Sequence, residues 1–138
     1  MIVDASVALK WFLDEPLTDK ALVLLPREDL HAPDIIVPEI LNGLRKGVRD
    51  QRISKTSAAD AIGKIELAIP SLCDSLLLAE RALEISLQLG HHINDCLYLA
   101  QAINMEADLV TADRAFVDLV TRKQPKLANR LLVLERLA

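Results

Sequence analysis

The chain is 138 residues long, which suits one domain with a substantial core, and 51% of its residues are hydrophobic, which excludes an intrinsically disordered protein. Aromatic residues make up 3% of the sequence, so a protein that stacks RNA bases on rows of aromatic rings is disfavoured. The net charge of −4 argues against general affinity for nucleic acids, although it does not exclude a local basic surface.

The sequence also predicts where the protein resides. No apolar run approaches the ~20 residues that span a membrane. The N-terminus has no basic segment followed by an apolar stretch and a cleavage site, so a cytoplasmic protein is expected. Cys73 and Cys96 lack the spacing of zinc ligands, and we expect them to pack as small hydrophobic side chains.

Strands and helices alternate along the first half of the chain. A side-chain oxygen such as that of Ser6 can cap the first helix. Apolar residues recur every four positions at Ile36, Ile40, Leu44 and Val48, which indicates an amphipathic helix. The predicted elements are a strand at 1–4, helices at 6–13 and 19–25, a strand at 30–32, a helix that ends near 47 and a helix at 54–67.

The second half repeats this alternation. Pro70 cannot donate a hydrogen bond to a sheet, so the strand that contains it is expected at an edge. Gly90 is expected to end one helix and Asn94 to cap the next. The predicted elements are a strand at 68–72, helices at 75–89 and 95–105, a strand at 107–111, a helix at 113–122 and a strand at 131–134.

Strands separated by helices are typical of an α/β protein with a parallel sheet that is covered on both faces. Ligands of such sheets bind beyond the carboxyl ends of the strands. Asp4 and Asp113 each follow a predicted strand directly, and Glu39 and Asp95 lie near helix starts from which they could reach the same crevice. The expected site therefore contains four acidic residues.

These four carboxylates are set among apolar residues or at strand ends, where an ionised group is unfavourable unless it is paired or binds a cation. If Asp4, Glu39, Asp95 and Asp113 converge, they provide oxygen ligands for a hard divalent cation. The sequence therefore predicts a site for Mg²⁺ or Mn²⁺. We expect at least one of the four acids to have a raised pKa when no cation is bound.

The acids and their neighbours resemble the PIN-domain ribonucleases, specifically the VapC-type toxins of type II toxin–antitoxin systems. The resemblance runs from residue 1 to the end of the chain and depends on four motifs in order rather than on any one alone. The motifs are Val3-Asp4-Ala5-Ser6, Glu39-Ile40-Leu41-Asn42 preceded by Ala32-Pro33, Asp95-Cys96-Leu97-Tyr98, and Val110-Thr111-Ala112-Asp113.

The resemblance implies a single PIN domain over residues 1–138, built as a three-layer α/β/α sandwich with a central parallel sheet. It implies metal-dependent endoribonuclease activity, a VapB-type antitoxin as partner and a homodimer. By the same resemblance, Asp4, Glu39 and Asp95 would hold the main ion, and Asp113 would complete the site or hold a second ion.

Three polar residues in the motifs are candidate supporting or substrate-binding residues. Ser6 and Thr111 could bind a phosphate oxygen or a water molecule, or they could be only a helix cap and a strand residue. Asn42 follows Glu39 by three positions, so it lies on the same helix face and could orient it.

Basic residues could contact the phosphates of an RNA substrate. Lys10 lies one helical turn after Ser6 and could point at the site. Arg45, Arg49 and Arg52 would share a face if their helix continues through all three, although such a stripe is more often a solvated surface.

Two other classes of protein remain open at this point. A non-catalytic PIN-like binding module would have lost an acidic residue, and all four are present. A phospho-acceptor receiver domain would have adjacent acids early in the chain and a lysine after a late strand. Asp4 has no acidic neighbour, and no lysine follows the strand predicted at 131–134.

Overall fold

Five short strands alternate with helices in the computed structural model, which describes residues 1–137. The elements in chain order are β1 (Ile2–Val3), α1 (Ala5–Ala8), the 3₁₀ helix η1 (Leu9–Trp11), α2 (Thr18–Leu24), β2 (Ala32–Pro33), α3 (Ile36–Arg49), α4 (Lys55–Ala68), β3 (Leu72–Cys73), α5 (Ser75–Leu89), α6 (Ile93–Met105), β4 (Leu109–Thr111), α7 (Arg114–Lys123), α8 (Pro125–Ala128), β5 (Leu131–Val133) and the 3₁₀ helix η2 (Leu134–Arg136).

All of the strand pairs are parallel, as the sequence predicts. β1, β4 and β5 form one sheet, with Ile2 opposite Leu109, and β2 and β3 form a second. A parallel bridge between Ile2 and His31 joins the two sheets. The backbone N–H of Val3 donates to the His31 carbonyl over 3.0 Å, so the strands follow one another in the order β3-β2-β1-β4-β5.

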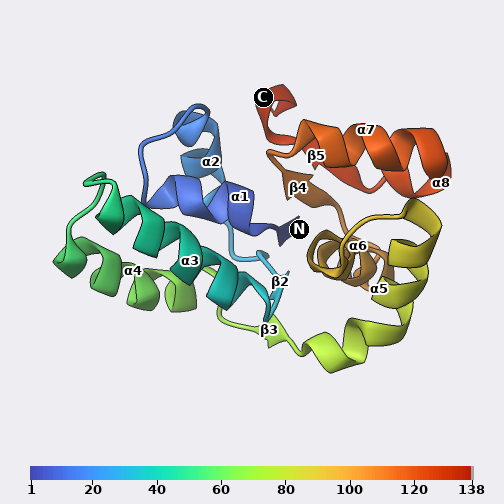
Figure 1. Ribbon diagram of the computed structural model, residues 1–138, viewed down its shortest axis with the longest axis horizontal. Coiled ribbons are helices and arrows are strands. Elements are labelled where there is room, and N and C mark those ends of the chain that lie inside the picture. Colours follow the sequence, from blue (N-terminus) through green and yellow to red (C-terminus); the bar gives the residue numbers. More distant parts are fainter. Residues whose placement is uncertain (138) are drawn as a thin grey trace.

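Helices cover both faces of the strands and give the three-layer α/β/α fold expected for this chain. Figure 1 shows α1 to α4 on one side of the strands and α5 to α8 on the other. The helix α6 packs against strands and against α5, and all residues from Cys96 to Ala102 are buried in it. A helix that is apolar nearly all round has no polar face for solvent, which explains why it lies in the interior.

The order of the strands reverses between β1 and β4. The chain passes from β1 to β2 and β3 on one side, and it later returns to place β4 and β5 on the other side of β1. A reversal of this kind opens a crevice at the carboxyl ends of the two strands. Asp4 and Asp113 lie just beyond those ends. The helix α6 leads into the parallel strand β4 and therefore runs in the opposite direction to the strands. Its N-terminus, which carries Asp95, thus lies at the edge formed by the carboxyl ends of the strands.

The strand predicted at 68–72 is wrong in its bounds. The helix α4 continues to Ala68, and the N–H of Ile69 still donates to the carbonyl of Ile65 over 2.8 Å. Pro70, which has no N–H, lies in the loop, and β3 begins at Leu72 beyond it. The expectation of an edge strand is confirmed, because within residues 1–137 β3 pairs with no strand other than β2.

Two predicted helix caps are also wrong. Asp4 rather than Ser6 caps α1, because the helix begins at Ala5 and Ser6 therefore lies inside its first turn. The helix α6 begins at Ile93, so Asn94 lies inside its first turn instead of before it. Within residues 1–137, no helix combines the length and the apolar character needed to cross a lipid bilayer.

Candidate active site

Asp4 is the most deeply buried of the four acids, with 8% of its surface exposed. It follows β1 directly, and its Oδ1 accepts a hydrogen bond from the N–H of Val7 over 3.1 Å, which caps α1. Burial, and to a smaller extent the charge of Asp95, raises the pKa of the Asp4 carboxyl, whereas hydrogen bonds from Ser6, Thr111 and Val7 lower it; the net effect is a pKa of about 6. The predicted raised pKa is therefore found at this residue.

Two hydroxyl groups connect Asp4 to the end of β4. The Ser6 hydroxyl donates to Asp4 Oδ1 over 2.5 Å, and the N–H of Ala112 donates to Ser6 Oγ over 3.1 Å. Thr111 is 1% exposed, and its hydroxyl also hydrogen-bonds with Asp4. Ser6 thus fixes the carboxylate and joins the two strand ends, and the Asp4 side chain fills the role of helix cap.

Glu39 lies in the first turn of α3, which follows β2. The Tyr98 hydroxyl donates to Glu39 Oε1 over 2.6 Å, and the Asn94 side chain also hydrogen-bonds with Glu39. Burial raises the pKa of Glu39, and it also raises the pKa of Tyr98. Gly43, one turn further along α3, lets this helix approach η1, because a Cβ there would lie 2.5 Å from the Leu9 side chain.

Asp95 faces two histidines. Its Oδ2 lies 2.6 Å from His91 Nε2 and 3.2 Å from His92 Nε2. Its charge raises the pKa of both Asp4 and Glu39, so Asp95 lies close enough to each of these carboxylates to repel it. The structure thus brings Asp95 near both Asp4 and Glu39, and their shared role as metal ligands stays a prediction.

Asp113 stands apart from the other three acids. It caps α7, with Oδ1 accepting a hydrogen bond from the N–H of Phe116 over 3.0 Å. Its own N–H donates to Thr111 Oγ1 over 3.1 Å, which connects it to Asp4 through one hydroxyl. Among residues 1–137, its carboxylate forms no ion pair and no hydrogen bond with the side chains of the other acids.

The donor set at this edge of the sheet fits a hard divalent cation. Asp4, Glu39 and Asp95 offer carboxylate oxygens from three different elements, and burial raises the pKa of the first two. A bound cation would offset both the burial and the mutual repulsion of these groups. In the described part of the chain, however, the residues whose donor atoms all lie within 4.8 Å are His91, His92 and Asp95, rather than the four acids.

Sequence reasoning missed Tyr98, Asn94 and His91 as parts of this site. The only sequence signal is helical spacing, because Tyr98 lies three residues after Asp95, and His91 lies four residues before it. Asn42, which was expected to orient Glu39, is exposed, and Asn94 is the asparagine that hydrogen-bonds with Glu39.

The basic residues differ in their surroundings. Lys10 is 9% exposed, and no hydrogen bond or ion pair of its side chain is found within residues 1–137. The predicted stripe does not share one helix, because α3 ends at Arg49 and Arg52 lies beyond it, with its guanidinium donating to the Asp14 carbonyl over 2.8 Å. Arg49 pairs with the neighbouring Asp50 over 2.9 Å.

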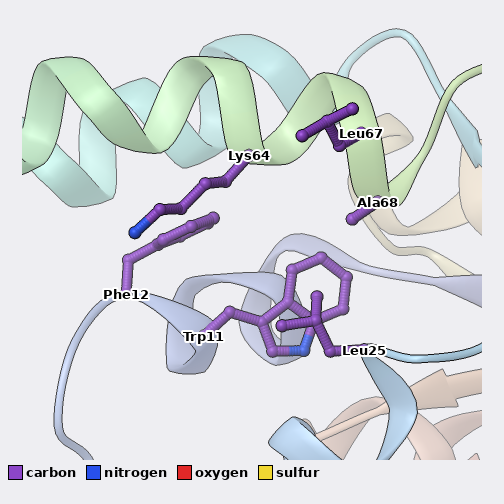
Figure 2. Close-up of a pocket in the computed structure, with 6 residues that line it drawn as sticks. All are labelled: Trp11, Phe12, Leu25, Lys64, Leu67 and Ala68. Carbon is purple, nitrogen blue, oxygen red and sulfur yellow. The ribbon is translucent and has the colours of Figure 1, made fainter.

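A separate apolar groove lies between η1 and α4. Figure 2 shows Trp11 and Phe12 on one wall and α4 on the other, with Leu25 beside the Trp11 ring and Lys64 alongside Phe12. The Trp11 indole N–H donates to the Ala21 carbonyl over 2.9 Å, which fixes the ring against α2. The groove is lined by Trp11, Phe12, Leu25, Lys64, Leu67 and Ala68.

Comparisons with known proteins agree with the geometry. The family model described as PIN domain matches residues 1–120. The chain is 30% identical over 118 residues to the VapC ribonuclease Mb0985 of Mycobacterium bovis and to the ribonuclease VapC9 of Mycobacterium tuberculosis, covering 86% of this chain and 89% of each relative. The crystal structure of PAE2754 from Pyrobaculum aerophilum superposes with a TM-score of 0.70 and 22% identity, covering 97% of this chain and 90% of that one.

Proposed function

The chain belongs to the PIN domain family as a VapC-type ribonuclease, and on this basis we propose that Asp4, Glu39, Asp95 and Asp113 form a Mg²⁺- or Mn²⁺-dependent centre that hydrolyses RNA phosphodiester bonds. The observation that carries this proposal is the placement of Asp4 and Asp95 where the strand order reverses, with Asp95 close enough to repel both Asp4 and Glu39. The proposed domain spans residues 1–138, of which Ala138 lies outside the described residues. The family model matches residues 1–120, and β5, which lies after them, pairs with β4. This pairing supports the proposal that the residues after 120 belong to the same domain.

The position of each acid suggests its role in binding the cations. Asp4, Glu39 and Asp95 would hold the main cation, and Asp113 would complete its coordination or hold a second one. When bound, the cation neutralises these carboxylates and activates water for attack on phosphorus. The Ser6 and Thr111 hydroxyls orient Asp4, and the Tyr98 hydroxyl and the Asn94 amide orient Glu39.

Lys10 is the residue that we assign to the RNA phosphate. Long side chains on a helix lie over the turn that precedes them, which here contains Ser6. Lys10 is 9% exposed as a whole residue, and within residues 1–137 no carboxylate pairs with its ammonium group, so a substrate anion could do so. Lys10→Met should raise KM for RNA more than it lowers kcat, and Lys10→Arg should restore part of the affinity. An unchanged KM in Lys10→Met would contradict the assignment.

A VapB-type antitoxin is the proposed protein partner. Its helix would lie in the groove between η1 and α4, where Trp11 and Phe12 offer apolar contact and Lys64 offers a charge for an acidic side chain. Phe12→Glu should therefore weaken antitoxin binding in a pull-down assay without affecting RNA cleavage. Equal antitoxin binding by Phe12→Glu and the wild type would place the partner elsewhere.

A homodimer is proposed through α5. Leu76, Leu83 and Leu87 are separated by seven and four positions, so they share one face of the helix, and each is more than half exposed. Two copies could bury this apolar face about a twofold axis. Light scattering should report a dimer for the wild type and a monomer for Leu83→Glu.

The nuclease proposal is tested with end-labelled RNA and purified protein that is free of antitoxin. We expect cuts with Mg²⁺ or Mn²⁺, none with EDTA, and none by Asp95→Asn at the same concentration. Circular dichroism should show that Asp95→Asn is folded. Cleavage in EDTA, or cleavage by Asp95→Asn at the wild-type rate, would contradict the proposed centre.

A further inference from the structure

The loop between α5 and α6 brings two imidazole rings onto one carboxylate. His91 Nε2 lies 2.6 Å and His92 Nε2 lies 3.2 Å from the same atom, Asp95 Oδ2. The donor atoms of these three residues all lie within 4.8 Å of one another. The side chains are 22%, 64% and 21% exposed, so an ion can reach them from solvent.

The loop holds these rings in place by identifiable contacts. Gly90 ends α5 in the left-handed conformation, with a φ of 65°, and turns the chain towards α6. The Ser86 hydroxyl donates to the His91 carbonyl, and the N–H of His91 donates back to the Ser86 carbonyl over 3.2 Å. The Phe116 ring lies 5.0 Å from the His91 ring, between centroids. The His91 ring is thus fixed by α5 and by α7.

The chemistry of this donor set differs from that of the acids around it. Two imidazole nitrogens and one carboxylate oxygen suit Zn²⁺, Co²⁺ or Ni²⁺, whereas Mg²⁺ prefers oxygen ligands alone. Donors bound at ~2.0 Å to a tetrahedral ion lie about 3.3 Å apart. The distance of 3.2 Å from His92 to Asp95 already fits, and the shorter distance from His91 requires only a small opening.

We propose that His91, His92 and Asp95 form a transition-metal site that takes Zn²⁺, with solvent in the fourth position. Asp95 is also a proposed ligand of the Mg²⁺ or Mn²⁺ centre, so Zn²⁺ at this site withdraws that carboxylate and inhibits RNA cleavage. The inhibition rests on the proposed ribonuclease function, whereas the binding of zinc does not.

The binding is tested on the full chain without RNA, after removal of metal with EDTA and desalting. Zn²⁺ is titrated in competition with a chromophoric chelator. We expect one tight site per chain in the wild type, about tenfold weaker binding in His92→Ala, and at least about a hundredfold weaker binding in the double variant His91→Ala/His92→Ala. His31→Ala is the matched control, because His31 is the remaining histidine of the chain, and it should bind as the wild type does.

The exposed position of His92 makes its single variant safe for folding, so the binding result can be interpreted even if the double variant is unstable. Equal affinity of the wild type and His92→Ala would overturn the proposal, as would an equal loss in His31→Ala. A Co²⁺-loaded wild type should show the visible absorption of a four-coordinate ion, and His92→Ala should lose it.

The inhibition is tested by adding Zn²⁺ to cleavage reactions at fixed Mg²⁺. We expect His92→Ala to need about tenfold more zinc for half inhibition than the wild type and His31→Ala. Identical zinc sensitivity in all three would overturn the competition for Asp95. Absence of cleavage in Mg²⁺ alone would instead contradict the nuclease proposal, and the RNA-free titration would still decide the zinc site.

Discussion

The ends of β1 and β4 have the same local structure, but the aspartate at the first is buried and the aspartate at the second is only half-buried. At each end an aspartate follows the strand and caps the next helix through a hydrogen bond from the residue three positions on, Val7 N–H at 3.1 Å for Asp4 and Phe116 N–H at 3.0 Å for Asp113. Each is also next to a hydroxyl, from Ser6 and Thr111 respectively.

The two aspartates differ in what surrounds them. Asp4 is 8% exposed and its pKa is raised to about 6, whereas Asp113 is half-buried at the start of α7. The local cap explains why an aspartate suits both positions, but only burial beside Asp95 makes the charge of Asp4 unfavourable in the absence of a cation. Two strand ends with the same local hydrogen bonds can therefore differ in how strongly they favour a bound cation.

The largest expected difference between the two ends is in catalysis. Asp4→Asn should lower the rate of RNA cleavage about a thousandfold, because a metal ligand contributes several kcal/mol to the transition state. Asp113→Asn should lower the rate only about ten- to a hundredfold. Asparagine preserves both helix caps, so single-turnover rates compare the charges alone. Equal losses would remove the functional distinction between the two strand ends.

The second difference is in how stability depends on pH. The pKa of Asp4 is raised from 3.8 to about 6, so its contribution to stability is complete below pH 4 and is lost as the pH rises through 6. Between pH 5 and 7.5, urea unfolding of the metal-free wild type should show a loss of about 1 kcal/mol from this group. Asp4→Asn should lack this component, Asp113→Asn should keep it, and Mg²⁺ should reduce it.

The third prediction concerns the support of the buried acids. Tyr98→Phe removes the 2.6 Å hydrogen bond to Glu39, so we expect a loss of about 1–2 kcal/mol in the free energy of unfolding and about tenfold in the cleavage rate. Chemical denaturation and single-turnover kinetics measure the two effects. A loss of stability with no change in rate would mean that Tyr98 serves only packing.

The smallest effect is expected at the link between the two ends. Ser6→Ala removes the hydroxyl that donates to Asp4 and accepts from Ala112 N–H, which should lower the unfolding free energy by about 1 kcal/mol. The removal also leaves Asp4 with one donor fewer, so the pH component described for Asp4 should grow. A Ser6→Ala variant with an unchanged pH profile would show that Ser6 does not influence the Asp4 charge.

Much of the fold could be predicted from the sequence because periodicity and turn residues act locally. The mostly apolar stretch predicted as a helix at 95–105 is the buried helix α6, and the alternation of strands and helices indicated a parallel sheet. The bounds of β3 could not be predicted, because α4 continues to Ala68 through a hydrogen-bond pattern that the residues around Pro70 do not reveal.

The acids could be named from the sequence, but their surroundings could not. The contact between Glu39 and Tyr98 spans 59 positions, and the contact between Ser6 and Ala112 spans 106, so neither leaves a local pattern. The histidines beside Asp95 are only four and three positions away. They could still be taken for solvated loop residues, because the sequence does not show that their side chains point towards Asp95. Long-range packing decided the first case, and the local turn at Gly90 decided the second.

The placement of β1 against β4 also has a consequence for synthesis. Ile2 pairs with Leu109, so during synthesis β1 waits for more than a hundred further residues before its neighbour on the β4 side is made. Until then Asp4 and Ser6 lack the neighbours that the end of β4 provides, Thr111 and Ala112. The proposed centre therefore cannot assemble on a growing chain until β4 and the residues that follow it have been made.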